Sequence, residues 1–212
     1  MLSSLPRSPF LYPILDAEHS TNLLVDAQDV IRAGAKILQI RAKKEGKRRL
    51  YGITQEITAL CGEERVCCIV NDCVDIALIT DASGVHLGQL DFPVTEARSL
   101  LPGKIIGVST HNSDQFAEAG RQPVDYIAIG PVFQTTTKTN ADPALGLSAV
   151  LSILKKKTKP VVAIGGIRRE HIAQLLAAGV DGIALISEVY RSGAVYENVS
   201  RMMEKIRSHE EV

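Results

Sequence analysis

Short apolar runs alternate along this chain with longer stretches in which apolar residues recur at helical spacing. The run from Val66 to Val70 is uninterrupted, as in strands that are buried on both faces of a parallel sheet. Further along, Ile172, Leu175 and Leu176 form one stripe of an expected helix, and Gly179 ends it. This alternation predicts a succession of strand-then-helix units.

The strand-then-helix unit recurs eight times, with a period of roughly two dozen residues. Strands are expected at residues 10–16, 36–40, 66–70, 84–87, 104–108, 125–129, 160–163 and 182–186. Helices are expected at residues 22–33, 47–60, 74–79, from 93 onward, and at 113–119, 147–155, 169–178 and 196–208. Asn22 or Thr21, and Asn112 or Ser113, are expected to cap two of these helices.

Eight such units predict an α/β fold, a single-domain (β/α)8 TIM barrel that spans residues 1–212. Residues 1–9 are expected to form a flexible N-terminal extension. A doubly wound open sheet is the alternative, but the Gly-x-Gly-x-x-Gly turn of dinucleotide-binding sheets does not follow the first expected strand. The sequence therefore favours the barrel.

The composition supports one core and gives no sign of a macromolecular partner. The chain has 212 residues, 45% of them hydrophobic, and a formal net charge of zero. A neutral protein lacks the long-range field typical of nucleic-acid and membrane-surface binding. The N-terminal apolar run is broken by Pro13 and Asp16, so it resembles neither a signal peptide nor a membrane span. We expect a cytoplasmic protein.

The cysteines do not form a metal or redox motif. Cys61, Cys67, Cys68 and Cys73 fall outside the Cys-x-x-Cys spacing of such sites. Cys67 and Cys68 are adjacent in an expected strand and must face opposite sides. We expect reduced, mostly buried thiols.

Polar residues follow or end most of the expected strands. In a barrel, the loops that follow the strands gather at one face, so these residues are predicted to line one mouth. They are Gln39, Arg41, Lys43, Asn71, Asp72, Asp91, Ser109, His111, Thr135, Thr137, Lys138, Gly166 and Ser187.

Several of these side chains suit a phosphorylated substrate. The stretch from Thr135 to Lys138 offers three hydroxyls and an ammonium, which could hold a phosphate or pyrophosphate, although a solvated polar loop would have the same composition. Arg41 and Lys43 add two further cations, and for Arg41 a structural ion pair is the alternative. Gly165-Gly166 lies where barrels bind phosphate on backbone amides, or it is a plain tight turn.

Two carboxylates suggest a metal. Asp72 and Asp91 are hard oxygen donors after neighbouring strands, which suits Mg²⁺ that bridges to substrate phosphates. Each could instead cap the helix that follows it. His86 lies inside a strand and is expected to be a hydrogen-bonded barrel residue, while a catalytic role for His111 is left open. No serine has a histidine and acid partner suited to nucleophilic hydrolysis.

Taken together, these motifs resemble the thiamine-phosphate synthase family over nearly the whole chain. The motifs are Gln39-Ile40-Arg41-Ala42-Lys43, Asn71-Asp72, His86-Leu87-Gly88-Gln89-Leu90-Asp91, Gly107-Val108-Ser109-Thr110-His111, the stretch from Gly130 to Lys138, and Gly165-Gly166-Ile167. In that family a barrel joins hydroxymethylpyrimidine diphosphate to a thiazole phosphate and releases pyrophosphate, with Mg²⁺. Two departures are Ala42, where the family usually has an acid, and Gln134, where it usually has proline.

The resemblance implies three groups of site residues, with Lys138, Ser109 and Arg41 also implied in catalysis. Gln39, Arg41, Lys43, Asn71, Ser109 and Lys138 would bind the pyrimidine diphosphate. Asp72 and Asp91 would hold Mg²⁺. Thr135, Thr137, Gly166, Ile186 and Ser187 would bind the thiazole phosphate.

Two other functions fit the same pocket. A thiazole tautomerase-like relative tends to lack the full diphosphate and metal set, which is present here, and a non-catalytic protein could merely bind a thiamine-related phosphate. The expected partners are phosphorylated small molecules, with no nucleic acid and no membrane, and the sequence leaves a homodimer open.

Overall fold

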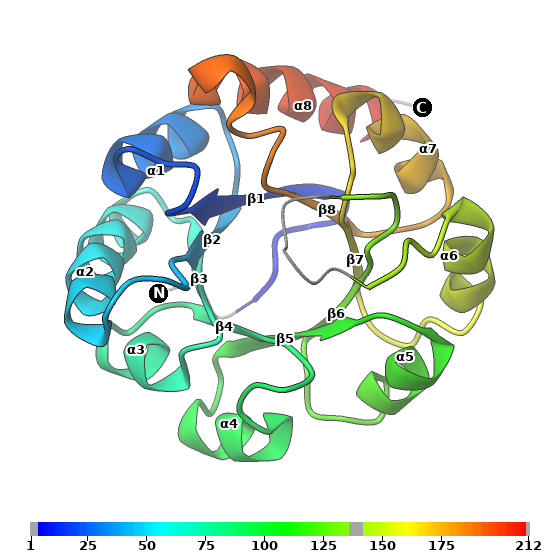
Figure 1. Cartoon of the computed structure of the whole chain (residues 1–212), viewed down its shortest axis with the longest axis horizontal. Coiled ribbons are helices and arrows are strands. Elements are labelled where there is room, and N and C mark those ends of the chain that lie inside the picture. Colours follow the sequence, from blue (N-terminus) through cyan, green and yellow to red (C-terminus); the bar gives the residue numbers. More distant parts are fainter. Residues whose placement is uncertain (1–3, 136–141, 211–212) are drawn as a thin grey trace.

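The structure, a computed structural model, describes residues 4–135 and 142–210. In this part of the chain, eight parallel strands close into a barrel in sequence order, with the first strand paired to both the second and the eighth (Figure 1). The strands are β1 (Phe10–Asp16), β2 (Ile37–Arg41), β3 (Cys67–Asn71), β4 (Gly84–Leu87), β5 (Ile105–Thr110), β6 (Tyr126–Ile129), β7 (Val161–Ile164) and β8 (Gly182–Leu185). The predicted barrel is confirmed, and the open sheet is excluded.

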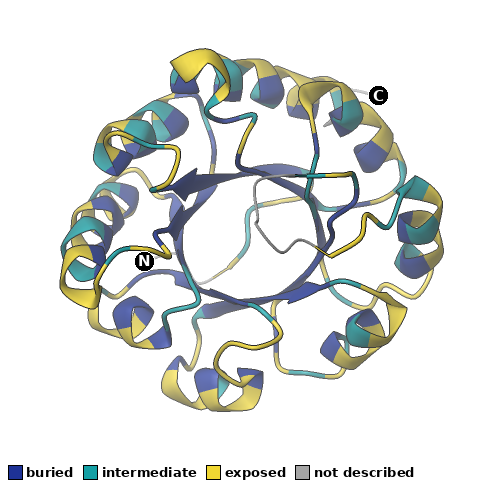
Figure 2. Ribbon diagram, in the orientation of Figure 1, coloured by how far each residue is buried: buried dark blue, intermediate teal, exposed yellow. Residues whose placement is uncertain are grey.

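The helices form a ring outside the strands (Figure 1). They are α1 (Leu23–Arg32), α2 (Lys47–Glu63), α3 (Val74–Ile79), α4 (Val94–Leu100), α5 (Ser113–Ala119), α6 (Leu147–Leu154), α7 (Ile172–Ala177) and α8 (Val195–Glu210), with the short 3-10 helices η1 (Arg169–His171) and η2 (Arg191–Gly193). Each α-helix packs buried apolar side chains inward, and its outer face is exposed to solvent (Figure 2).

The core has two layers separated by the strands. The inner cluster fills the barrel and includes Phe10, Tyr12 and Tyr126, and the larger outer cluster lies between the strands and the helices. Because side chains alternate along a strand, Cys67 belongs to the inner cluster and Cys68 to the outer one, as expected. All four cysteines are free thiols.

Most element boundaries lie within a residue or two of those expected. Asn22 and Asn112 cap α1 and α5, each with its side-chain oxygen accepting two backbone amides. One difference is at α2, which continues through Gly62 to Glu63 instead of ending near residue 60. The helix expected to start at residue 169 begins as the 3-10 turn η1 before it becomes α7.

Part of the N-terminal extension contacts the barrel. Leu5 packs against the inner cluster, and the Cys67 thiol donates to the backbone oxygen of Ser4 at 3.3 Å. Among the described residues, no helix has both the length and the apolar character required to cross a bilayer.

Candidate active site

Two adjoining cavities open where the strands end. The wider has a volume of about 520 Å³. The smaller, of about 80 Å³, reaches into the barrel, where Tyr12 and Gln39 line it. Lys43, Asp91 and Ser109 belong to both walls, so the two cavities form one site.

The structure brings the sequence-predicted residues together in this site. Thr135, Gly166, Ser187 and Ile186 line the wider cavity. The smaller cavity is lined by Gln39, Arg41, Lys43, Asn71, Asp72, Asp91, Ser109, His111 and Ile186. Thr137 and Lys138 lie outside the described residues.

The two carboxylates face a shared position between β3 and β4. The ammonium of Lys43 lies 3.1 Å from Asp72 Oδ2, and Asp91 Oδ2 accepts a 2.7 Å hydrogen bond from the Gly88 amide. Burial, together with the neighbouring Asp91 carboxyl, raises the pKa of Asp72 despite the opposing effect of Lys43. Neither carboxylate caps a helix, because the cap positions of α3 and α4 are Cys73 and Pro93.

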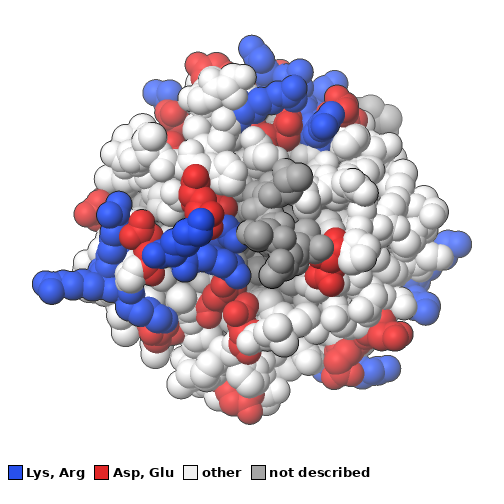
Figure 3. All heavy atoms as spheres, in the orientation of Figure 1, with Lys and Arg blue, Asp and Glu red and all other residues white. Residues whose placement is uncertain are grey.

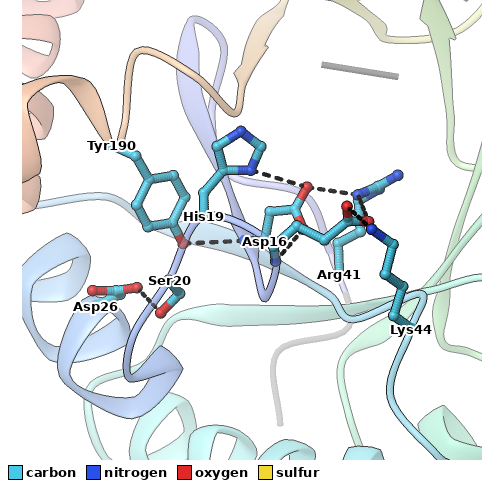
Figure 4. A network of polar contacts seen from close by, with 8 residues as sticks. Asp16, His19, Ser20, Asp26, Arg41, Lys44 and Tyr190 are labelled. Carbon is cyan, nitrogen blue, oxygen red and sulfur yellow. Dashed lines mark hydrogen bonds and ion pairs between the residues drawn. The ribbon is translucent and has the colours of Figure 1, made fainter. Parts of the chain in front are cut away.

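Arg41 is held by a buried ion pair (Figure 4). It lies opposite Asp16 in the β1–β2 register, and its Nη1 is 2.6 Å from Asp16 Oδ2. Asp16 is fully buried, and its backbone amide donates to the Tyr190 hydroxyl at 3.1 Å. His19 stacks on the Tyr190 ring and lies 3.6 Å from the same carboxylate oxygen. The ion pair expected as an alternative role for Arg41 is therefore present, and the guanidinium also lines the smaller cavity.

A chain of hydrogen bonds crosses the barrel interior beneath the smaller cavity. Gln39 Nε2 donates to the Tyr12 hydroxyl at 3.0 Å, and that hydroxyl lies 3.0 Å from the Tyr126 hydroxyl. His86 continues the chain, with Nδ1 2.8 Å from the Tyr126 hydroxyl and Nε2 2.8 Å from Ser109 Oγ. Burial raises the pKa of both tyrosines, which keeps their hydroxyls protonated. His86 is thus the hydrogen-bonded barrel residue that the sequence predicted.

Close packing explains two of the glycines near the site. A Cβ on Gly107 would lie 2.0 Å from Tyr126 Cζ, so only glycine admits the tyrosine ring to the barrel at this position. Gly166 has a φ of 63°, and a Cβ there would lie 2.3 Å from the backbone oxygen of Gln134. Backbone of the loop after β6 therefore lies directly against the Gly165-Gly166 turn.

His111 lies on the wall of the site. Its Nδ1 is 2.6 Å from the Gly130 backbone oxygen and 3.5 Å from a carboxylate oxygen of Asp142. These contacts anchor the ring between β5 and the loop after β6, and its catalytic role stays open.

Asp16, Tyr12 and Tyr126 were not predicted as site residues. The signal for Asp16 was present in the sequence, because it is a carboxylate at the end of the first strand. The tyrosines gave no such signal, since each is an aromatic residue within an apolar strand. Only closure of the barrel brings their hydroxyls together.

The charges at the mouth are mixed in sign. Figure 3 shows basic side chains next to acidic ones near the centre of this face, over β1 to β3, and further side chains of both signs toward the left edge. The described residues contain no group of three or more His, Cys, Asp or Glu arranged to hold a metal.

The fold is a (β/α)8 barrel whose site, at the carboxyl ends of the strands, is lined by cations, a carboxylate pair and a glycine turn. A family model described as thiamine monophosphate synthase matches residues 11–189. The chain belongs to this family.

Individual relatives agree with the family match. The thiamine-phosphate synthase of Methanospirillum hungatei is 45% identical over 77% of this chain and 80% of its own length. That of Clostridium novyi is 40% identical over 86% of this chain and 91% of its own. Among solved structures, thiamine phosphate pyrophosphorylase from Pyrococcus furiosus has a TM-score of 0.87 and 32% identity, covering 94% of this chain and 96% of its own.

Proposed function

We infer that this chain is a thiamine-phosphate synthase, a transferase that joins hydroxymethylpyrimidine diphosphate to a thiazole phosphate and releases pyrophosphate. The family match over residues 11–189 is the observation that supports this most directly. The convergence of Arg41, Lys43, Asp72 and Asp91 on one cavity agrees with it, because these are the groups that a diphosphate substrate requires.

We assign the smaller cavity to the pyrimidine and the mouth around Lys43 to its diphosphate. Gln39, Asn71 and Ser109 bind the pyrimidine part, while Arg41, Lys43 and Lys138 bind the diphosphate. Thr135, Thr137, Gly166, Ile186 and Ser187 bind the thiazole phosphate in the wider cavity. The support is that the described members of each group line the matching wall.

Asp72 and Asp91 fit a Mg²⁺ site. Burial next to a second carboxyl raises the pKa of Asp72, which is the situation that a bound cation relieves. Oxygen ligands from two carboxylates and substrate phosphates are what Mg²⁺ prefers. When bound, Mg²⁺ would neutralise charge on the diphosphate and its leaving group.

The residues of the chain favour a dissociative substitution. The carbon–oxygen bond to pyrophosphate breaks first, the electron pair leaves with the pyrophosphate, and the pyrimidine methylene becomes a cation stabilised by the ring amino group. Arg41, Lys43 and Lys138 hold the departing anion. The thiazole nitrogen, positioned by the wider cavity, then forms the new carbon–nitrogen bond at close range.

Incubation with both substrates and Mg²⁺ tests this function. We expect equal amounts of pyrophosphate and thiamine monophosphate, and neither product when one substrate is omitted. A thiazole tautomerase would convert the thiazole compound without pyrophosphate release, and a binding protein would leave both substrates unchanged. No comparison supports either of these alternatives.

A further inference from the structure

We propose that Tyr12 and Tyr126 are specificity-determining residues that make Gln39 present a hydrogen-bond acceptor and Ser109 a donor to the pyrimidine. The pair thereby selects an aminopyrimidine over its oxo counterpart. The proposal rests on the function proposed above, because it concerns the pyrimidine end of the same site.

The donor and acceptor roles along the chain can be assigned one after another, beginning with Gln39. Its amide nitrogen donates to the Tyr12 hydroxyl, so the amide oxygen is the group that Gln39 offers to the smaller cavity. Tyr12 is 1% exposed, and its hydroxyl, which accepts from Gln39, has Tyr126 as its next neighbour. Since a buried hydroxyl proton needs an acceptor, Tyr12 donates to Tyr126.

The same reasoning continues to Ser109. Tyr126 accepts from Tyr12 and therefore directs its own proton at His86 Nδ1, 2.8 Å away. A neutral imidazole that accepts at Nδ1 carries its proton on Nε2, which lies 2.8 Å from Ser109 Oγ. Ser109 accepts this bond, and its hydroxyl proton is left to point at a ligand. The cavity then offers an acceptor at Gln39 and a donor at Ser109.

These two groups match an aminopyrimidine. Its exocyclic amino group donates and the adjacent ring nitrogen accepts, which complements Gln39 and Ser109 respectively. The oxo counterpart in its lactam form has the reverse arrangement, with a carbonyl that accepts and a ring N–H that donates. A site built to hydrogen-bond one pattern strongly rejects the other, because its polar groups are left unpaired.

Each tyrosine has only one hydroxyl proton, so it can donate in one direction along the chain only. This couples the orientation of Gln39 at one end to that of Ser109 at the other. If the Gln39 amide turned over, every hydrogen bond in the chain would have to reverse, and Ser109 would become an acceptor at the cavity, so the oxo compound binds only at the free-energy cost of reversing the whole chain. Gln39 and Ser109 therefore change together. Removing either tyrosine hydroxyl interrupts the chain and lets each end adopt its own orientation.

Binding measurements on two hydroxyl-deletion variants test the proposal. The dissociation constants of the aminopyrimidine diphosphate and of its oxo analogue are measured calorimetrically for wild type, Tyr12→Phe and Tyr126→Phe, without the thiazole substrate. We expect wild type to prefer the amino compound by about 10⁴-fold. In both variants this ratio is expected to fall at least about tenfold, the scale of one buried polar group left unpaired.

Tyr196→Phe is the matched control. Tyr196 lies on α8, outside the barrel. The Cζ atom of Arg32 lies 4.3 Å from the centroid of its ring, a contact that phenylalanine preserves. We expect an unchanged binding ratio in this variant.

Nitrogen NMR of His86 shows which ring nitrogen carries the proton, and this would not change if the tyrosines had only a structural role. We expect the ring to be neutral with its proton on Nε2 in wild type, and to gain the Nδ1-protonated tautomer in Tyr126→Phe. A binding ratio that both variants leave within twofold of wild type would overturn the proposal, as would an Nδ1-protonated ring in wild type or a wild type without preference.

The dissociation constants also allow a failure of this proposal to be distinguished from a failure of the proposed function. Preference for the amino compound, lost in both variants, would uphold the tyrosine pair even if no pyrophosphate were released. Pyrophosphate release with an unchanged preference in the variants would support the function and remove the role of the tyrosines.

Discussion

The Asp16–Arg41 pair illustrates how one buried residue sets the position of a cationic group that lines the smaller cavity. We expect Asp16→Asn to destabilise the protein by about 3 kcal/mol, because it leaves Arg41 buried without its counterion. Turnover should also fall about a hundredfold, since the guanidinium loses its orientation. Denaturant unfolding and steady-state kinetics measure the two effects.

Asp29→Asn is the control for this change. Asp29 pairs with Arg32 at 2.9 Å on the surface of α1, where an ion pair contributes little. Stability should change by less than about 0.5 kcal/mol. Full turnover in a destabilised Asp16→Asn would show that other contacts orient Arg41.

The pair of carboxylates, Asp72 and Asp91, should lower the stability of the metal-free protein and allow it to bind Mg²⁺. Because the folded protein disfavours ionised Asp72, the neutral Asp72→Asn is expected to raise the metal-free Tm by about 2 °C. Mg²⁺ should raise the Tm of wild type but not of the variant, and the Mg²⁺ concentration for half-maximal rate should rise at least about tenfold. Thermal unfolding with and without Mg²⁺ checks this independently of activity.

Asp75→Asn is a control that should change the metal-free Tm in the opposite direction. Burial acts to raise the pKa of Asp75, but hydrogen bonds from Lys47 and the Ile76 amide outweigh it and lower the pKa. Its ionised form therefore stabilises the fold, and its loss should lower the Tm without changing the Mg²⁺ requirement. A lower metal-free Tm in Asp72→Asn would contradict the proposed carboxylate repulsion.

Lys138 is predicted from the sequence alone to stabilise the departing pyrophosphate. Lys138→Ala should reduce turnover about a hundredfold or more, the scale of one preorganised charge-stabilising donor, and should leave the Tm unchanged. Lys205→Ala, on the exposed outer side of α8, is the control. Wild-type turnover in Lys138→Ala would remove this role.

At the scale of elements, the turn after β7 and the loop after β6 act as a unit. Gly166→Ala would force a Cβ to 2.3 Å from the Gln134 backbone oxygen and strain a φ of 63°. We expect the KM for the thiazole phosphate to rise about tenfold and that for the pyrimidine diphosphate to change far less. Equal effects on both would undermine the separate assignment of the two cavities.

Gly52→Ala is the matching control within a helix. Gly52 lies inside α2, and apart from the adjoining backbone of the helix itself nothing lies within 4 Å of the position that a Cβ would take, so alanine fits there. The substitution should stabilise the protein by about 0.5–1 kcal/mol, because alanine loses less backbone entropy than glycine on folding. Both KM values should stay unchanged.

At the scale of the whole molecule, binding of one substrate in each of the two cavities, as proposed above, would enclose both at the mouth of the barrel, which suits a short-lived cation. An electron-withdrawing substituent on the pyrimidine ring should slow the chemical step steeply, with each 1.36 kcal/mol added to the barrier reducing the rate about tenfold. Single-turnover measurements prevent product release from masking this effect. A rate insensitive to the substituent would favour direct displacement by the thiazole nitrogen.

Much of the site could be predicted because, in a barrel, a residue that directly follows a strand lies at the same end of the molecule as all other such residues. Asn71, Asp72 and Asp91 follow expected strands, and in a barrel all such positions meet at one mouth. The same rule could not show that Asp72 and Asp91 face one another rather than cap α3 and α4. That choice depends on side-chain direction, which in turn depends on how the neighbouring strands and loops pack.

The sequence by itself determined the eight strand-then-helix units, the two faces of each strand and the gathering of polar residues at one end, because these follow from local spacing of apolar residues. Tertiary structure alone decided which side chains meet inside the barrel. Tyr12 and Tyr126 are 114 residues apart, yet their hydroxyls lie at 3.0 Å. Such a contact depends on barrel closure and on the space left by Gly107, neither of which is a local property of the chain.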